Sequence, residues 1–295
     1  MAGEMSKELI ISPRSECVAV ELAEAAAWSA YAAELREVLG AAIEKSGADL
    51  LEVGGLLVSE PLPEEHRGLR NGAEVRPPQA IGLAEGMAAG RGPYCQLSAP
   101  GKLQIESGWD GAVHLNTTPA VAADLAGLHG ESVTFWWRDA APEPIEVSDP
   151  VDAVADAGFW ARVAEASERL TLVCERWAHG AHGCRWFRVT PESTAEVARL
   201  LRPRSLVCVA TEPELNPRTE LLQDGFTAFA APLPHGELAH RNYPSGADTL
   251  SEVMEVMDDG FSLMLADAAL GDWCAVVPDT DGVARGQWEN PGGSS

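Results

Sequence analysis

The residues best suited to chemistry lie in a segment of eleven residues, Cys174 to Cys184, which contains two cysteines and two histidines. Thiolate sulfur and imidazole nitrogen are ligands that Zn²⁺ accepts in tetrahedral sites. If the segment is a hairpin with its tip at residues 178–183, Cys174 lies well below the tip that carries His179 and His182. Cys174, His179, His182 and Cys184 are therefore weak metal-ligand candidates, and we predict that the chain holds no metal. A solvent-exposed tip, on which the two histidines contact a partner, is the favoured interpretation.

Two acidic segments could also bind a ligand. Glu252, Glu255, Asp258 and Asp259 are spaced so that their carboxylates could gather near a helix end, although a solvated helix face explains the same spacing. The segment 279–282 resembles the opening of a calcium-binding loop. It lacks the third ligand and the distal glutamate, which favours a plain turn.

Catalytic and cofactor motifs are missing from the sequence. It contains no Gly-x-Ser-x-Gly elbow, no phosphate-binding loop and no Gly-x-Gly-x-x-Gly fingerprint, so we predict no cofactor. Cys174, Cys208 and Cys274 lie among apolar neighbours, which is typical of inert core thiols. Catalytic residues stay unknown, and an enzyme is not excluded, because acids and bases can converge from distant positions.

Tryptophan is unusually frequent, with nine residues against three tyrosines. Trp109 and Trp177 lie beside two expected hairpin tips. Tryptophan is enriched at binding hot spots, so both are candidate binding residues, with local packing as the alternative.

The elements around the cysteine segment form a pattern that occurs twice. Strands at 170–177 and 184–189, a helix opened by Thr190-Pro191 and a strand at 205–210 match strands at 102–106 and 112–116, a helix opened by Thr118-Pro119 and a strand at 132–137. Thr and Pro suit the cap and first position of a helix. A duplication and two independently capped helices are both consistent with the pattern.

The other elements follow from periodicity and from glycine and proline positions. We predict a strand at 9–11, a helix at 18–45, a strand at 50–58 with a bulge at Gly54-Gly55, an extended Pro77-Pro78 and a helix at 80–89. A capped helix is expected at 249–257, a strand at 226–231, and a last hairpin from strands at 261–266 and 273–277.

Length and a linker rich in proline and acid at 139–150 divide the 295 residues into two domains. We predict an N-terminal domain over 1–147, a C-terminal domain over 148–282 and a flexible tail over 283–295. The predicted fold class is α+β, with two halves that share the hairpin–helix–strand repeat. Each half has an antiparallel sheet covered by helices.

The composition restricts the partners. A net charge of −24 with 45 acidic and 21 basic residues disfavours binding to nucleic acid or to an anionic membrane, since both need clustered lysine and arginine. The acidic surface serves solubility or complements a basic protein partner. For the second case, residues 204–295, with a net charge of −11, are the place to look.

Location follows from features that the sequence lacks. It shows no signal peptide and no apolar run of about 18 residues. Six irregularly spaced cysteines are typical of reduced thiols. We expect a cytoplasmic protein, and the oligomeric state is open.

The leading functional hypothesis is a non-catalytic acidic binding protein, for example an inhibitor or immunity-type partner of a basic protein. One alternative is a metal-dependent hydrolase centred on His179, His182 and Cys184 or on His235 and His240. The other is a small-ligand sensor with a cleft between the halves.

Overall fold

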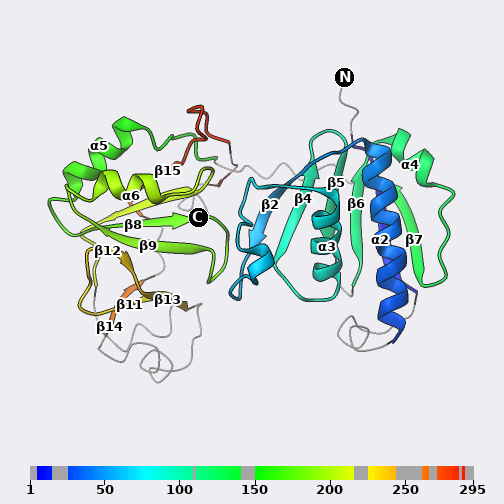
Figure 1. The fold of residues 1–295 in the computed structure, drawn as a ribbon, viewed down its shortest axis with the longest axis horizontal. Coiled ribbons are helices and arrows are strands. Elements are labelled where there is room, and N and C mark those ends of the chain that lie inside the picture. The colour runs from blue at the N-terminus through cyan, green and yellow to red at the C-terminus, as the bar shows by residue number, and fades with distance from the viewer. Residues whose placement is uncertain are drawn as a thin grey trace. The chain divides into compact units, whose positions relative to one another are not determined.

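The chain divides into two compact units in the computed structural model, which describes residues 5–14, 26–108, 111–140, 150–215, 225–243, 261–265, 271–285 and 288–289. Unit 1 comprises Met1–Val58 and Leu62–Glu146, and unit 2 comprises Ser59–Pro61 and Val147–Ser295 (Figure 1). Over the described residues the chain forms five α-helices and three antiparallel sheets, which confirms the predicted α+β class.

Unit 1 is built on a seven-stranded antiparallel sheet with the strand order β3-β2-β4-β5-β6-β1-β7. The strands are β1 (Lys7–Pro13), β2 (Leu51–Leu57), β3 (Glu74–Val75), β4 (Tyr94–Ala99), β5 (Leu103–Ser107), β6 (Val113–Thr117) and β7 (Val133–Asp139). The register between β2 and β4 shifts between Gly54 and Leu57, where the two glycines predict a bulge.

The helices of unit 1 pack against one face of this sheet, as Figure 1 shows for α2 (Ala26–Ser46) and α3 (Pro77–Ala88). The buried stripe of α2 includes Leu35, Leu39 and Ile43. The expectation of an extended Pro77-Pro78 is wrong, because α3 begins at Pro77, where a missing N–H costs nothing. The short helix α4 (Pro119–Leu125) begins after Thr118, whose hydroxyl accepts the Val121 N–H at 3.4 Å. A 3₁₀ turn, η1 (Glu64–His66), lies between β2 and β3.

Unit 2 contains two sheets. The five-stranded sheet has the order β12-β9-β8-β10-β15 and the three-stranded sheet the order β13-β11-β14. The strands are β8 (Thr171–Arg176), β9 (Cys184–Val189), β10 (Leu206–Thr211), β11 (Phe226–Ala230), β12 (Gly236–Leu238), β13 (His240–Tyr243), β14 (Phe261–Leu265) and β15 (Trp273–Val276). The expected last hairpin is wrong, because its two strands, β14 and β15, belong to different sheets.

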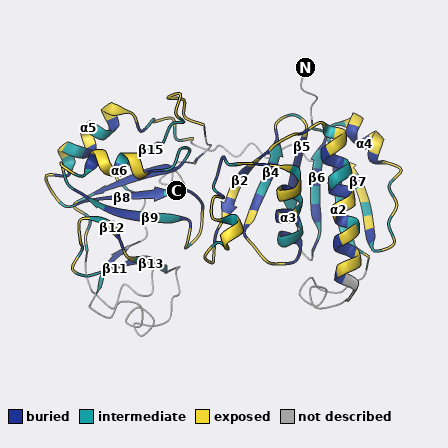
Figure 2. Ribbon diagram, in the orientation of Figure 1, coloured by how far each residue is buried: buried dark blue, intermediate teal, exposed yellow. Residues whose placement is uncertain are grey.

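Both faces of the five-stranded sheet are buried, and Figure 2 shows β8 as a buried strand. On one face Val173, Phe187 and Val207 pack under α5 (Ala157–Ala166) and α6 (Thr194–Leu200). On the other face Trp186 packs against Phe229 of the three-stranded sheet, with ring centroids 5.4 Å apart. Unit 2 therefore has three layers: helices, sheet and second sheet.

The predicted repeat is not confirmed. Each unit has a hairpin, a short helix and a strand in the same chain order, namely β5, β6, α4, β7 and β8, β9, α6, β10. In unit 1 the closing strand β7 lies beyond β1, on the side of the second hairpin strand. In unit 2 the closing strand β10 pairs with β8, the first hairpin strand. The second helix also begins later than expected, at Thr194, because residues 191–193 form a turn in which the Ser193 N–H bonds to the Thr190 hydroxyl.

A fully buried carboxylate fixes the end of α6 against the sheet of unit 2. Glu175 accepts the backbone N–H of Arg202 at 2.5 Å and the Ser205 hydroxyl at 3.0 Å, and it pairs with the Arg185 guanidinium. A buried charge is tolerated only when such partners satisfy it.

We expect Glu175→Ala to lower the free energy of unfolding of unit 2 by about 3–5 kcal/mol, because it leaves Arg185 and two donors without their acceptor. Chemical denaturation of the full chain measures the effect. Glu196→Ala, on the exposed face of α6, is the matched control and should change stability by less than about 0.5 kcal/mol. Equal effects of the two substitutions would contradict this role of Glu175.

Candidate functional sites

Five of the eight predicted binding residues lie outside the described residues and stay predictions: Trp109, Glu252, Glu255, Asp258 and Asp259. The other three, Trp177, His179 and His182, follow β8 in the tip of the β8–β9 hairpin. The structure separates their environments. Trp177 is buried at 9% exposure under the Arg202 guanidinium, whereas both histidines are exposed.

The hairpin tip packs onto a residue from the end of the chain. The His179 ring lies 5.3 Å from the ring of Trp288, which is only 4% exposed and donates its Nε1–H to the Arg204 carbonyl at 2.8 Å. Trp288 thus belongs to the core of unit 2, although it falls within the segment for which a flexible tail is predicted. His182 is exposed in the tip and fits the prediction of an exposed contact residue better than His179 does.

The tip ends in a close backbone contact that places Cys184 at the start of β9. The N–H groups of Trp177 and Ala178 both donate to the Gly183 carbonyl, at 2.9 and 3.0 Å. A Cβ atom at Gly183 would collide with the backbone of Ala178, so this position requires glycine.

Cys184 is surrounded by polar groups from β13, not by the tip histidines. Its Sγ lies 3.8 Å from His240 Nε2 and accepts a hydrogen bond from Asn242 Nδ2 at 3.2 Å. Cys174 lies on the same face of the paired strand β8, diagonally across from Cys184. The Cys184 thiol is partly exposed, and the structure places His240 beside it, whereas the sequence suggests His240 only as a partner of His235.

Neighbouring groups fix the orientation of these partners. Asn242 Oδ1 accepts the Thr227 hydroxyl at 2.8 Å, and its amide also donates to the Ala181 carbonyl at 3.0 Å. The His240 Nδ1–H is placed to donate to the Leu238 carbonyl at 3.3 Å, which leaves Nε2 to exchange a proton with Cys184.

Four cysteines share this face of the five-stranded sheet, and only one has a lowered pKa. Cys208 lies directly opposite Cys174 on one side and Cys274 on the other. Burial raises the pKa of all three, that of Cys208 to about 12. The hydrogen bond from Cys174 lowers the pKa of Cys184 to about 4 against the opposing effect of burial, with further help from His240 and Asn242.

The same contact acts on the histidine. Burial alone would lower the pKa of His240, but the hydrogen bond and the charge of Cys184 raise it above its ordinary value. The contact therefore acts on both partners, lowering the pKa of Cys184 and raising that of His240.

Metal ligation finds no support in the described part of the chain, where no three histidine, cysteine or acidic side chains are arranged to hold an ion. In the loop at residues 279–282, which resembles the opening of a calcium-binding loop, arginine side chains bind the carboxylates. Arg204 bonds to Asp279 at 3.1 Å, and Arg285 bonds to Asp279 at 2.9 Å and to Asp281 at 2.6 Å. The metal-dependent hydrolase therefore stays a prediction without supporting geometry.

The face of the unit 1 sheet that the described helices leave uncovered carries a continuous line of polar side chains, which we name the polar row. Its members stand directly opposite one another across all seven strands: Glu74, Glu52, Ser98, Gln104, Asn116, Glu8 and Arg138. Within the row, Glu8 is almost fully buried and binds Arg138 through two hydrogen bonds, at 2.6 and 2.9 Å. The Arg138 hydrogen bond lowers the pKa of Glu8, although burial opposes it.

Exposed apolar side chains flank the polar row on the same face. Trp136, on the edge strand β7, is 69% exposed, and the directly opposed pair Leu57 and Tyr94 is 39% exposed at each residue. Between them, the carboxylate of Glu106 accepts hydrogen bonds from both Gln96 and Gln104. The face thus combines hydrogen-bonded carboxylates with exposed apolar side chains.

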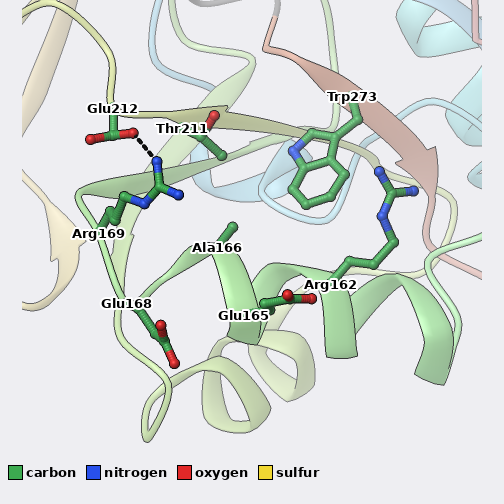
Figure 3. A pocket seen from close by; sticks show the side chains of 8 residues that line it. All are labelled: Arg162, Glu165, Ala166, Glu168, Arg169, Thr211, Glu212 and Trp273. Atoms are coloured by element: carbon green, nitrogen blue, oxygen red, sulfur yellow. Dashed lines mark hydrogen bonds and ion pairs between the residues drawn. The ribbon is translucent and has the colours of Figure 1, made fainter.

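A polar cavity of about 380 Å³ lies beside α5 in unit 2 (Figure 3). Its lining residues are Arg162, Glu165, Ala166, Glu168, Arg169, Thr211, Glu212 and Trp273. The Arg162 guanidinium lies 4.2 Å from the centre of the Trp273 ring, and Arg169 pairs with Glu212 at 2.5 Å. Among the described residues, no acceptor meets the buried Nε1–H of Trp273.

Several of these features cannot be predicted from the sequence. Alternation along β1, β4 and β7 predicts one polar face for each strand, but the polar row depends on the register between strands. Asn242 belongs to no sequence motif and lies 58 residues from Cys184 along the chain.

No protein-family model, curated protein or solved structure matches this chain at a significant level. Within the described residues, no helix has the length and apolar character needed to cross a membrane.

We expect Trp288→Ala to lower the free energy of unfolding by about 3–5 kcal/mol, because it empties a core position and removes the bond to Arg204. Thermal and denaturant unfolding of the full chain measure the change. Trp136→Ala, the same substitution at a 69% exposed site, should stay within about 0.5 kcal/mol of the parent. A stable Trp288→Ala chain would contradict the core position of Trp288.

Proposed function

We propose that this protein is a non-catalytic acidic binding protein whose partner is a basic protein, of the inhibitor or immunity type. The observation that carries the proposal is the open face of the unit 1 sheet, on which the polar row lies between exposed apolar side chains. An antiparallel sheet can present one face to water, and this face presents a tryptophan that is 69% exposed, the residue type enriched at binding hot spots.

Charge supports a basic partner. Glu52 and Glu74 are exposed on the open face, and Glu106 is partly exposed there. Arg138, the cation of the polar row, is bound to Glu8. With a net charge of −24, the chain attracts a lysine- and arginine-rich surface over long range, which raises the association rate and disfavours acidic competitors.

Trp136 is the proposed anchor. It stands directly opposite Ile10 on the neighbouring strand β1, so a partner that covers the tryptophan also covers this half-buried apolar neighbour. The proposal includes a cytoplasmic location, which the free thiols of Cys95, Cys174, Cys184, Cys208 and Cys274 support.

The experiment is affinity capture at low salt from a lysate of the organism that encodes the protein, with the full chain as bait. We expect a stoichiometric basic protein whose recovery falls as salt rises, and Trp136→Ala should weaken the isolated complex by about 30-fold, the effect of a hot spot of about 2 kcal/mol.

Leu200→Ala is the matched control, because Leu200 is 51% exposed on α6 of unit 2. It should leave the affinity unchanged. Capture of no stoichiometric partner would overturn the proposal, as would a complex weakened by Leu200→Ala and not by Trp136→Ala.

A small-ligand sensor is the second candidate function, and the cavity beside α5 favours it. The cavity joins two arginines, three glutamates and the aromatic ring of Trp273, whose buried Nε1–H meets no acceptor among the described residues. This composition fits a small polar ligand that carries both an anionic and a cationic group.

We expect a screen of free amino acids and related zwitterions to contain compounds that raise the melting temperature of the full chain and change its tryptophan fluorescence. Trp273→Phe, which keeps the ring and removes the N–H, should weaken the response. A response unchanged in Trp273→Phe would remove this cavity as the sensor site.

A further inference from the structure

Cys184 has the surroundings of a reactive thiol, and the proposed binding function makes no use of it. Its Sγ faces His240 Nε2 at 3.8 Å and the Asn242 amide at 3.2 Å, at a partly exposed position where the hairpin tip joins β9. We propose that Cys184 is an oxidation site for hydroperoxides and that Cys174 is its resolving thiol.

Each neighbour has a separate role in this proposal. His240 supplies a positive charge and a proton, and the Asn242 amide stabilises negative charge on sulfur. Arg176 lies directly opposite Cys184 on β8 and adds a second cation beside the thiols. Cys174 and Cys208 face this region from β8 and β10, and the charge of Glu237 on β12 acts on His240. Low-pKa thiolates with partial exposure and a nearby second thiol are the sites that oxidants select.

The chemistry balances without a further reactant. The Cys184 thiolate attacks the O–O bond, an S–O bond forms, and the leaving oxygen departs as water or alcohol with the proton of His240. The sulfur of Cys174 then attacks the sulfenic acid, an S–S bond forms and the S–O bond breaks. The thiol proton leaves with the hydroxyl as a second water. Two thiols lose two electrons, and one hydroperoxide accepts them.

The position of the pair permits this second step. Cys174 lies opposite Trp186 and Cys184 lies opposite Arg176, so the two cysteines are diagonal neighbours on one face of paired strands. Diagonal Cα atoms lie about 7–8 Å apart, slightly beyond the usual span of a disulfide. Closure therefore needs a small movement, and Cys184 is the first residue of β9, next to the tip.

Cys274 is a matched internal control. It lies on the same face of the same sheet and is also partly exposed, but burial raises its pKa, and among the described residues no histidine contacts it as His240 contacts Cys184. One measurement on the native chain can therefore compare two partly exposed cysteines on one sheet face.

The first experiment measures iodoacetamide alkylation of each cysteine in the unmodified full chain by mass spectrometry between pH 5.5 and 8. The thiolate fraction sets the alkylation rate. The rate of Cys184 should therefore change by less than about twofold over this range, whereas the rate of Cys274 should rise about tenfold per pH unit. His240→Phe and Asn242→Ala should each make the alkylation rate of Cys184 depend more steeply on pH, since each removes a group that stabilises the thiolate. A Cys184 profile as steep as that of Cys274 in the native chain would overturn the proposal.

The second experiment treats the reduced full chain with hydrogen peroxide. We expect a disulfide between Cys174 and Cys184, with Cys274 still reduced. In Cys174→Ser, a dimedone adduct of the sulfenic acid should appear at Cys184. Oxidation of Cys274 at the same rate as Cys184 would contradict the site, and an unbridged sulfenic acid at Cys184 in the native chain would contradict the role of Cys174.

Discussion

Alternation of side chains along each strand is the constraint on which the rest of the structure depends. In both units one face of a large antiparallel sheet is buried under helices, and the opposite face carries the residues available for other tasks. In unit 1 none of the described helices covers the opposite face, and the sequence places charged and amide groups there. In unit 2 the three-stranded sheet covers it, and cysteines and aromatic residues fill the space.

This difference explains why the two candidate sites have different chemistry. A face open to water can hold many carboxylates at little cost, which suits recognition of a basic surface. A covered face has a low dielectric, in which each polar group must find a partner. There the hydrogen bonds from Cys174 and Asn242 and the charge of His240 select Cys184 from four cysteines on one sheet face. The pKa values of Cys208 and Cys274, which lack these contacts, are raised.

Local patterns in the sequence predict the α+β class and the hairpin of β8 and β9, because strand alternation and the helix start at Thr118-Pro119 depend on near neighbours. Local patterns do not predict that β14 and β15 belong to different sheets, because their sequences are typical of two consecutive strands of one hairpin. The same limit applies to the sites. His240 lies 56 residues from Cys184, and β13 brings them together only after the chain has crossed from one sheet to the other. The polar row depends on six separate registers, none of which a single strand encodes.

The central claim is that the open face of unit 1 binds a basic protein. Hydrogen exchange of the full chain, measured with and without the captured partner, tests it most directly because the method reports each strand separately. The account predicts slower exchange on binding at β7 and β1, the strands that carry Trp136 and Ile10, with unit 2 unchanged. Slower exchange confined to unit 2, around the cavity beside α5 or the β8–β9 tip, would contradict it.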